Sequence, residues 1–140
     1  MVEGERKYVD VNVFVYWLTG EKKYLNRAKK WIEEIELRRG KFYTSVLTIY
    51  EVMVIIAGLM GRNLKDKELI ETILKALTSL PGLNFVNLEE KDFEKAIELM
   101  DKHHLDLEDA LHLASALKVG AKTIITNDED FERADIKRVF

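Results

Sequence analysis

The pattern of apolar and polar positions divides the chain into short strands that alternate with longer helices. Apolar runs rich in β-branched or aromatic residues predict strands, whereas longer segments with apolar residues three or four positions apart predict helices. The alternation predicts an α/β fold, with three layers α/β/α around a mostly parallel five-stranded sheet. The predicted strands span residues 8–11, 41–44, 83–88, 122–126 and 136–140.

Start and stop signals set the expected limits of the helices. Asn12 can cap the helix after the first strand, and Gly120 ends the helix that begins near Asp106. The predicted helices lie at residues 13–18, 21–41, 45–60, 66–80, 89–101 and between 106 and 120. The residues expected to face the interior are Phe93, Ile97 and Met100 in the fifth helix and Ala110, Leu113, Ala114 and Leu117 in the sixth.

The composition fits one cytoplasmic domain spanning residues 1–140. Hydrophobic residues make up 47% of the chain, enough for a single core. No apolar run approaches the roughly 20 residues of a membrane span, and the polar N-terminus does not resemble a secretion signal. Cysteine is absent, which excludes disulfides and thiolate metal sites. Glutamine is also absent and 34% of residues are charged, a bias typical of proteins from hot environments.

The net charge of −3 excludes a global nucleic-acid footprint, so any RNA contact must rest on a local basic patch. Residues 21–41 offer one, with eight basic side chains against four acidic ones. Two interpretations stay open: a solvated helix with ion pairs between its turns, or a phosphate-binding face. In the second interpretation, the candidate RNA-binding residues are Lys22, Lys23 and Arg27.

Four acidic residues lie where a charge is costly. Asp10 lies near the end of the first strand, and Glu51 lies inside a nearly all-apolar helix. Asp109 begins a buried helix, and Asp128 follows a buried strand. Buried carboxylates need partners, and ligands bind at the carboxyl ends of parallel strands. Because oxygen ligands favour Mg²⁺ or Mn²⁺, and such ions support hydrolysis of phosphodiesters, the four acids predict a metal-dependent nuclease site.

Each acid also has a structural interpretation. Asp109 could complete a capping box, Asp128 could occupy a turn, and Asp10 could form an Asx-turn. Glu51 is harder to explain in this way, because a carboxylate in mid-helix has no capping role.

The three histidines are expected to have surface or core-edge roles. His103 and His104 precede the last helix, whereas His112 lies one turn after Asp109, near enough to reach the site. A zinc hydrolase would require two histidines four residues apart or another clear ligand pair, which this sequence lacks.

The order of these motifs resembles that of the PIN domain family, and within it the VapC-type toxins of toxin–antitoxin pairs. The matching segments are YVDVN, SVLTIYEV, LEDALHLASAL and ITNDEDF, in that order over nearly the whole chain. The resemblance implies a PIN-like fold and a metal-dependent endoribonuclease with Mg²⁺ or Mn²⁺ as cofactor. Its implied catalytic and metal-binding residues are Asp10, Glu51, Asp109 and Asp128.

The resemblance also implies roles for the residues around these four acids. Asn12 would orient a ligand or water, and Thr48 and Thr126 would be polar neighbours of the acids. Asp130 is an additional acid, and the Thr-x-Asp match favours Asp128 over Asp130 as the metal ligand.

The implied partners are an RNA substrate and a small antitoxin protein. The helix at 45–60 further predicts a homodimer, because it has no wide polar face and the next helix would cover only part of it. Two other functions stay open: a PIN-like module that binds RNA or protein without cleavage, and a housekeeping RNA-processing nuclease. A receiver-type signalling domain is disfavoured, because Leu88 and Glu89 stand where its phospho-acceptor aspartate would end the third strand.

Overall fold

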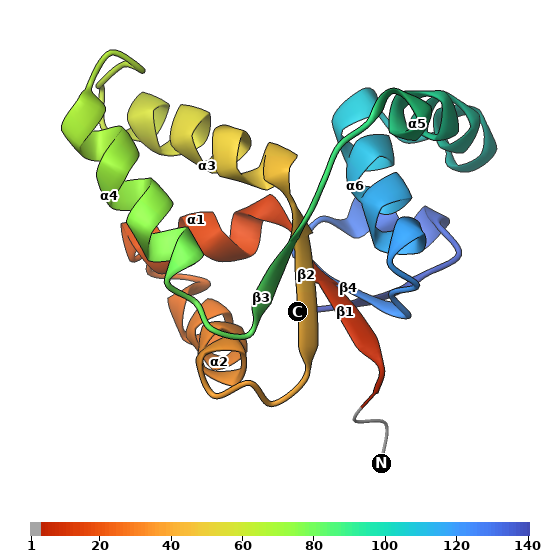
Figure 1. Ribbon diagram of the computed structural model, residues 1–140, viewed down its shortest axis with the longest axis horizontal. Helices are drawn as coiled ribbons and strands as arrows, with labels where there is room; N and C mark the ends of the chain where they lie inside the picture. The colour runs from red at the N-terminus through yellow and green to blue at the C-terminus, as the bar shows by residue number, and fades with distance from the viewer. Residues whose placement is uncertain (1–3) are drawn as a thin grey trace.

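The protein is built on a five-stranded sheet whose strand pairings are all parallel, in the order β3-β2-β1-β4-β5 (Figure 1). The computed structural model describes residues 4–140. The prediction of an α/β fold with a mostly parallel five-stranded sheet is confirmed. The strands are β1 (Arg6–Val9), β2 (Lys41–Ser45), β3 (Leu83–Val86), β4 (Thr123–Ile125) and β5 (Lys137–Val139).

Helices cover both faces of this sheet and create two separate cores. Successive residues of a strand point to opposite faces. Val9 and Ile125 therefore pack with α1 to α4, whereas Tyr8 and Ile124 pack with α5, α6 and the short 3₁₀ helix η1. The helices are α1 (Val11–Thr19), α2 (Leu25–Glu36), α3 (Val46–Leu59), α4 (Lys67–Thr78), α5 (Glu90–His103), α6 (Leu107–Lys118) and η1 (Glu129–Arg133).

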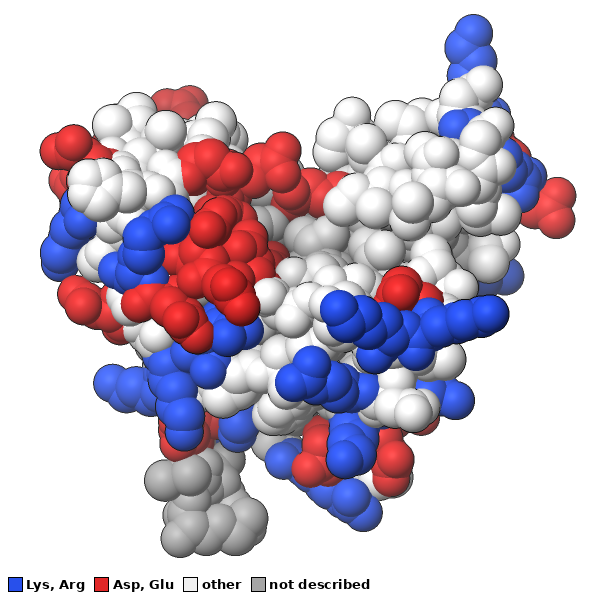
Figure 2. Space-filling view, turned by 180° about the vertical axis from the view of Figure 1, so that it is seen from behind, with Lys and Arg blue, Asp and Glu red and all other residues white. Residues whose placement is uncertain are grey.

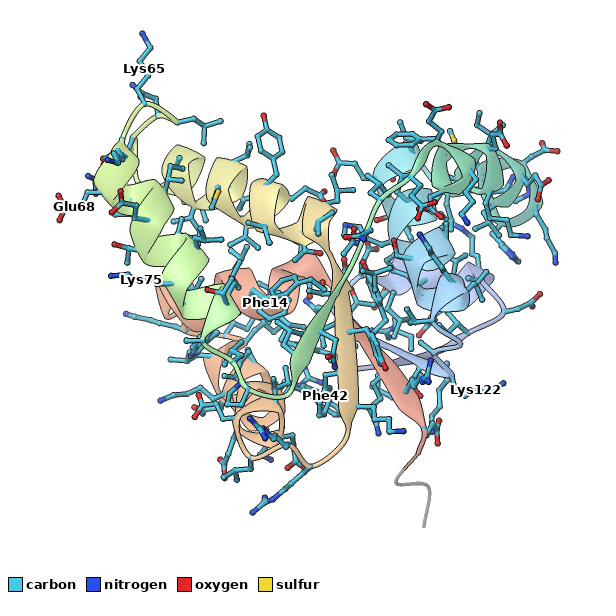
Figure 3. The ribbon with its side chains drawn as sticks, viewed as in Figure 1. Phe14, Phe42, Lys65, Glu68, Lys75 and Lys122 are labelled. Atoms are coloured by element: carbon cyan, nitrogen blue, oxygen red, sulfur yellow. The ribbon has the colours of Figure 1, made fainter. Side chains whose placement is uncertain are left out.

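The larger core lies between the sheet and the helices α1 to α4. Phe14 of α1 and Phe42 of β2 point into it and are almost completely buried (Figure 3). Charged side chains such as Glu68 and Lys75 on α4 point outward into solvent. The helices on this face thus follow the predicted division between apolar and polar positions.

The chain leaves β1 and β4 toward opposite faces of the sheet, although these two strands are neighbours. After β1 it enters α1, which packs in the larger core, and after β4 it enters η1, whose Phe131 packs in the other core. The Asp10 amide donates to the Ile125 carbonyl at 3.0 Å, which holds the two strand ends together. Such a divergence produces a crevice at the carboxyl ends of the strands.

The start of α1 differs from its prediction. The strand ends at Val9, and Asp10 rather than Asn12 caps the helix, because Asp10 has extended backbone angles and its Oδ1 accepts from the Val11 amide at 2.8 Å. Asn12 therefore lies inside the first helical turn. Its side chain is free to reach across to the segment after β4.

The prediction for the inner face of α5 was wrong for two of its three residues. Ile97 is 64% exposed and Phe93 is 42% exposed, whereas Ala96 and Leu99 are buried. The reason is that α5 packs against α6, which itself covers the sheet, so α5 buries only a narrow stripe. On α6 the prediction holds for Ala110, Leu113 and Ala114 but is wrong for Leu117, which is 41% exposed.

The helix α3 keeps an exposed apolar surface, as its sequence predicted. Val52 and Ile56 are buried, whereas Tyr50 is 59% exposed and Leu59 is 67% exposed. A broad uncharged surface is visible on the half of the molecule that carries α1 to α4 (Figure 2). Within residues 4–140, no helix combines the length and the apolar character needed to cross a membrane.

Candidate functional site

The four predicted acids lie around one cleft at the carboxyl ends of the strands. Asp10 follows β1, and Glu51 lies in the second turn of α3. Asp109 lies at the beginning of α6, and Asp128 follows β4. The cleft has a volume of about 310 Å³ and also contains Asn12, Tyr16, Glu108 and His112 in its walls. The structure thus brings together side chains that are up to 118 positions apart in the sequence.

The Thr126 hydroxyl organises the end of the cleft near Asp10. Thr126 is fully buried and donates to Asp10 Oδ2 at 2.7 Å. The Thr126 hydroxyl oxygen also accepts from Asn12 Nδ2 at 2.9 Å and from the Asp128 amide at 3.0 Å. One hydroxyl therefore links β1, α1 and the segment after β4, so the positions of two of the acids are coupled.

Asn12 ties the helix α1 to the same segment. Its Oδ1 accepts from the Asn127 amide at 3.2 Å, and Asn127 Nδ2 donates to the Tyr16 hydroxyl at 3.1 Å. Thr48, in contrast, does not reach the acids: its hydroxyl bonds to that of Thr44 at 2.7 Å. Thr44 in turn donates to the carbonyl of Val9, so these threonines connect α3 with β1.

Three aspartates crowd one side of the cleft. Ligand oxygens of Asp109, Asp128 and Asp130 all lie within 4.8 Å of one another. Burial, together with the negative charges of Asp128, Asp106, Asp10 and Asp130, raises the pKa of Asp109 to about 7. Burial also raises the pKa of Asp128. Oxygen ligands this close together, with charges that repel one another, are suited to hold a divalent cation.

The geometry favours Asp128 over Asp130 as a member of this group. Asp128 lines the cleft, whereas Asp130 is about half exposed and pairs with Arg133 at 3.3 Å. Asp128 also caps η1, since its Oδ1 accepts from the Asp130 amide at 2.9 Å. At the start of α6 the capping side chain is that of Asp106, whose Oδ1 accepts from the Asp109 amide at 2.9 Å. Asp128 therefore both caps η1 and lines the cleft.

On the other side of the cleft, Glu51 is paired with a histidine. Glu51 Oε1 lies 2.5 Å from His112 Nε2, and His112 Nδ1 lies 2.7 Å from the Tyr8 hydroxyl. Tyr8 also accepts from the Ser45 amide at 3.1 Å. The surface or core-edge role predicted for His112 was wrong, because this side chain is only 2% exposed and contacts the predicted site directly.

Glu51 and His112 shift each other's pKa. Burial alone would raise the pKa of Glu51, but the hydrogen bond and charge of His112 outweigh burial and lower it. Burial alone would lower the pKa of His112, but Tyr8, Glu51 and Asp10 outweigh burial and raise it. A hydrogen bond to Glu51 and the charge of Glu51 raise the pKa of Glu108. On this side of the cleft, the contact between the two side chains therefore favours the charged form of each.

Sequence reasoning noted that His112 could reach the site but gave it another role, and it did not name Glu108, Tyr8 or Tyr16 as residues of this region. A signal existed for His112, which lies three positions after Asp109 and so shares its helix face. His103 agrees better with its prediction: it ends α5, where its Nδ1 contacts the carbonyl of Arg133 at 3.1 Å. His104 is exposed in the left-handed backbone conformation that ends the helix.

The predicted RNA-binding residues are not among the residues that line the cleft. Lys22 and Lys23 lie between α1 and α2, and Lys23 lies 5.2 Å from the centre of the Tyr24 ring. Arg27 lies on α2 over the ring of Phe140, at 5.1 Å. In Figure 2 acidic side chains gather on one half of the molecule, and basic side chains form a band below the uncharged surface of the other half.

Comparison with known proteins assigns the chain to a family. The PIN domain family matches residues 7–137, and the chain belongs to this family. Among its relatives is Ribonuclease VapC1 of Aquifex aeolicus, which is 31% identical over 138 residues, 97% of this chain and 90% of that protein. A VapC ribonuclease of the same organism is 25% identical over 135 residues, 95% of each chain. The predicted resemblance to the PIN family and its VapC members is confirmed.

Solved structures agree on the fold. VapC20 of Mycobacterium tuberculosis, described as a Sarcin-Ricin loop cleaving toxin, matches with a TM-score of 0.75 at 18% identity, over 95% of this chain and 98% of that one. A toxin–antitoxin complex from Klebsiella pneumoniae matches with a TM-score of 0.66 at 22% identity, over 96% of both chains. At these identities the likeness supports the fold and not a shared substrate.

Proposed function

We propose that this protein is an endoribonuclease that depends on Mg²⁺ or Mn²⁺ and acts as the toxin of a toxin–antitoxin pair. The single observation that carries the metal dependence is the group of carboxylates Asp10, Asp109 and Asp128, of which none pairs with a lysine or arginine within residues 4–140. The names of the VapC ribonuclease relatives support the choice of RNA as substrate.

The residues present fit a hard divalent cation. Asp10, Asp109 and Asp128 would hold it through carboxylate oxygens, with Glu51 on the opposite wall. When bound, the cation would supply activation of a water molecule and neutralisation of charge on the departing oxygen. The Thr126 hydroxyl fixes Asp10 Oδ2, and His112 fixes Glu51, so the acids keep their positions while substrate enters.

Cleavage of single-stranded RNA in the presence and absence of metal tests the proposal. We expect the purified protein to cut RNA with Mg²⁺ or Mn²⁺ and to stop on addition of EDTA. The matched control is Asp10→Asn, which keeps the size of the side chain. Cleavage that persists undiminished in EDTA would refute the metal mechanism. Metal-dependent RNA binding without cleavage would favour the alternative function, a PIN-like module that binds without cutting.

The biological setting is a second part of the proposal. Toxin–antitoxin complexes among the structural relatives support a small antitoxin protein as partner. The test is whether the neighbouring gene encodes a small protein that binds this chain and inhibits its cleavage of RNA. A neighbouring gene without such an activity would favour a housekeeping RNA-processing nuclease.

A homodimer through α3 completes the proposal. The exposed apolar residues Val54 and Ile55 on this helix, together with Tyr50 and Leu59, support a contact between two copies. Light scattering at micromolar concentration should give about twice the chain mass of 16.3 kDa. Tyr50→Asp should reduce this value toward the mass of one chain. A parent protein that is monomeric across that concentration range would contradict the dimer.

A further inference from the structure

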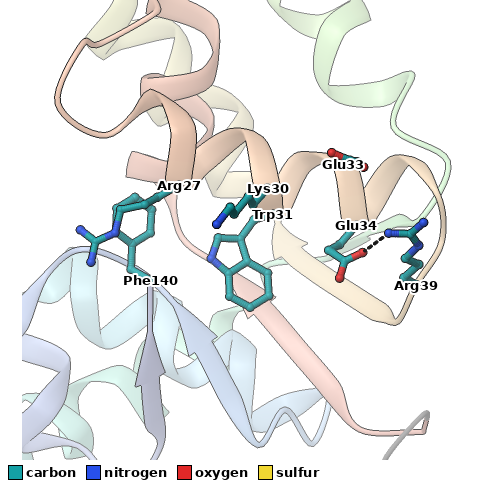
Figure 4. A pocket seen from close by; sticks show the side chains of 7 residues that line it. All are labelled: Arg27, Lys30, Trp31, Glu33, Glu34, Arg39 and Phe140. Atoms are coloured by element: carbon teal, nitrogen blue, oxygen red, sulfur yellow. Dashed lines mark hydrogen bonds and ion pairs between the residues drawn. The ribbon is translucent and has the colours of Figure 1, made fainter.

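A second groove lies beside α2, outside the acidic cleft. Its volume is about 490 Å³, and Trp31, Phe140, Arg27 and Lys30 are among the residues that line it (Figure 4). In this view Arg27 lies over Phe140 and Lys30 lies beside Trp31. The two acidic residues of the groove do not pair with Arg27 or Lys30. Glu34 pairs with Arg39 at 3.4 Å, and Glu33 points away from the Trp31 ring.

Aromatic rings connect this groove to the acidic cleft. Tyr16 is part of the wall of the cleft, and its ring centre lies 5.8 Å from that of Phe140, which lines the groove. Tyr24 contacts both, at 4.8 Å from Tyr16 and 6.0 Å from Phe140. The two depressions are therefore joined by a continuous aromatic surface.

Cations lie over the rings of this surface. Arg27 lies 5.1 Å from the centre of Phe140, and Lys23 lies 5.2 Å from the centre of Tyr24. Alternating aromatic and basic side chains along a groove suit a single-stranded nucleic acid, whose bases stack on rings while its phosphates meet cations. A duplex would not suit this surface, because its bases are already stacked on one another.

The charge distribution gives a reason for such a surface. The chain is acidic overall, and the cleft contains several carboxylates, so phosphates are repelled from most of this region. Arg27, Lys30 and Lys23 provide local positive charge beside the cleft. An RNA strand gains from this charge only if it continues beyond the site of cleavage onto α2.

We propose that single-stranded RNA in the acidic cleft continues over Tyr16 and Phe140 into the groove on α2, where an unpaired base stacks on Trp31 beside Arg27 and Lys30. This inference rests on the proposed function and adds a requirement to it. The substrate must be unpaired for several nucleotides on one side of the scissile bond.

Binding of RNA without cleavage tests the groove directly. In an Asp109→Asn background with Mg²⁺, a labelled single-stranded RNA of about 12 nucleotides, within the usual site sizes of such surfaces, would be titrated by fluorescence anisotropy. We expect Trp31→Leu to weaken binding roughly 5- to 100-fold, as loss of one stacked base does. Lys30→Ala should weaken it less and reduce its salt dependence. The control is Lys67→Ala on α4, whose side chain is 88% exposed.

Folding and stacking can be separated. Trp31 is half-buried against the larger core, so the leucine variant retains an apolar side chain there, and its melting temperature should stay near that of the parent. In a Trp17→Phe variant, Trp31 is the remaining tryptophan of the two in the chain. RNA should quench its fluorescence if a base stacks on it.

Substrate length separates this inference from the proposed function. With the Asp109 side chain intact, Trp31→Leu should slow cleavage of the long RNA but not of a dinucleotide, which is too short to reach the groove. If the long RNA is bound and cut equally well by parent and variant, the groove proposal is overturned while the nuclease stands. If the parent cuts no RNA but Trp31→Leu still weakens RNA binding, the nuclease proposal fails and the groove proposal is supported.

Discussion

The two sides of the acidic cleft shift the pKa values of their carboxylates in opposite directions. Glu51 is held by His112, and its pKa is lowered, whereas Asp109 faces other carboxylates, and its pKa is raised to about 7. The difference arises from partners rather than from burial, because burial acts against the charged form on both sides. A carboxylate with a cationic partner is satisfied by the protein alone. Among residues 4–140, no lysine or arginine pairs with Asp109 or Asp128, which is why we propose a bound cation as their partner.

The largest expected effect is that of Asp109→Asn. This change removes a charged oxygen ligand but keeps the size of the side chain, so cleavage should fall by more than about 100-fold, the upper range seen for loss of outer-sphere metal contacts. The metal-free variant should melt at a higher temperature than the parent, since repulsion among the aspartates is relieved. Cleavage assays and thermal melts in EDTA measure the two effects. A variant that loses activity and also melts lower would indicate a structural role for Asp109.

His112→Ala tests the other side of the cleft. The change leaves Glu51 as a buried carboxylate without its partner and opens a cavity, so stability should fall by about 3 kcal/mol. Cleavage should fall about 10- to 100-fold, because Glu51 is no longer held in place. Urea denaturation and single-turnover kinetics measure these quantities.

A double-mutant cycle gives the control for this pair. Combining His112→Ala with Glu51→Gln should cost less than the sum of the two single changes, with a coupling of about 1–3 kcal/mol. Additive effects on stability would mean that the short contact between these side chains contributes nothing of its own.

The pH dependence of stability sharpens the comparison. The folded-state pKa of Asp109, about 7, lies above its ordinary value of 3.8 in the unfolded chain. The folded state therefore binds the extra proton, and the stability due to Asp109 is present below pH about 4 and lost as the pH rises through about 7. In EDTA, the parent should lose stability relative to Asp109→Asn as the pH rises from about 4 to about 7. A constant difference between the two proteins would rule out a raised pKa at this residue.

The smallest effect is expected for Asp130→Asn. Asp130 pairs with Arg133 at the surface, so its replacement should change cleavage by less than about 10-fold and stability by less than about 1 kcal/mol. Asp128→Asn, by comparison, should reduce cleavage as strongly as Asp109→Asn. Equal losses from both changes would place Asp130 among the metal ligands as well.

The sequence by itself determined the position of the candidate site. Apolar runs marked β1 and β4, and their following residues Asp10 and Asp128 had to meet once the strands became parallel neighbours. Helix start signals placed Asp109, because capping acts within a few residues along the chain. Periodicity likewise predicted that α3 would keep an apolar surface, since one neighbouring helix cannot cover all of it.

Only the tertiary structure decided which side chains meet across elements. The pairing of Glu51 with His112 joins α3 to α6 over a separation of 61 positions, and no local pattern encodes a distance between two helices. The same holds for Trp31 and Phe140, which face one groove although they lie far apart in the sequence. The exposed face of α5 was mispredicted for this reason: periodicity gives the stripe that can be buried, but the neighbour that buries it is set by packing of the whole chain.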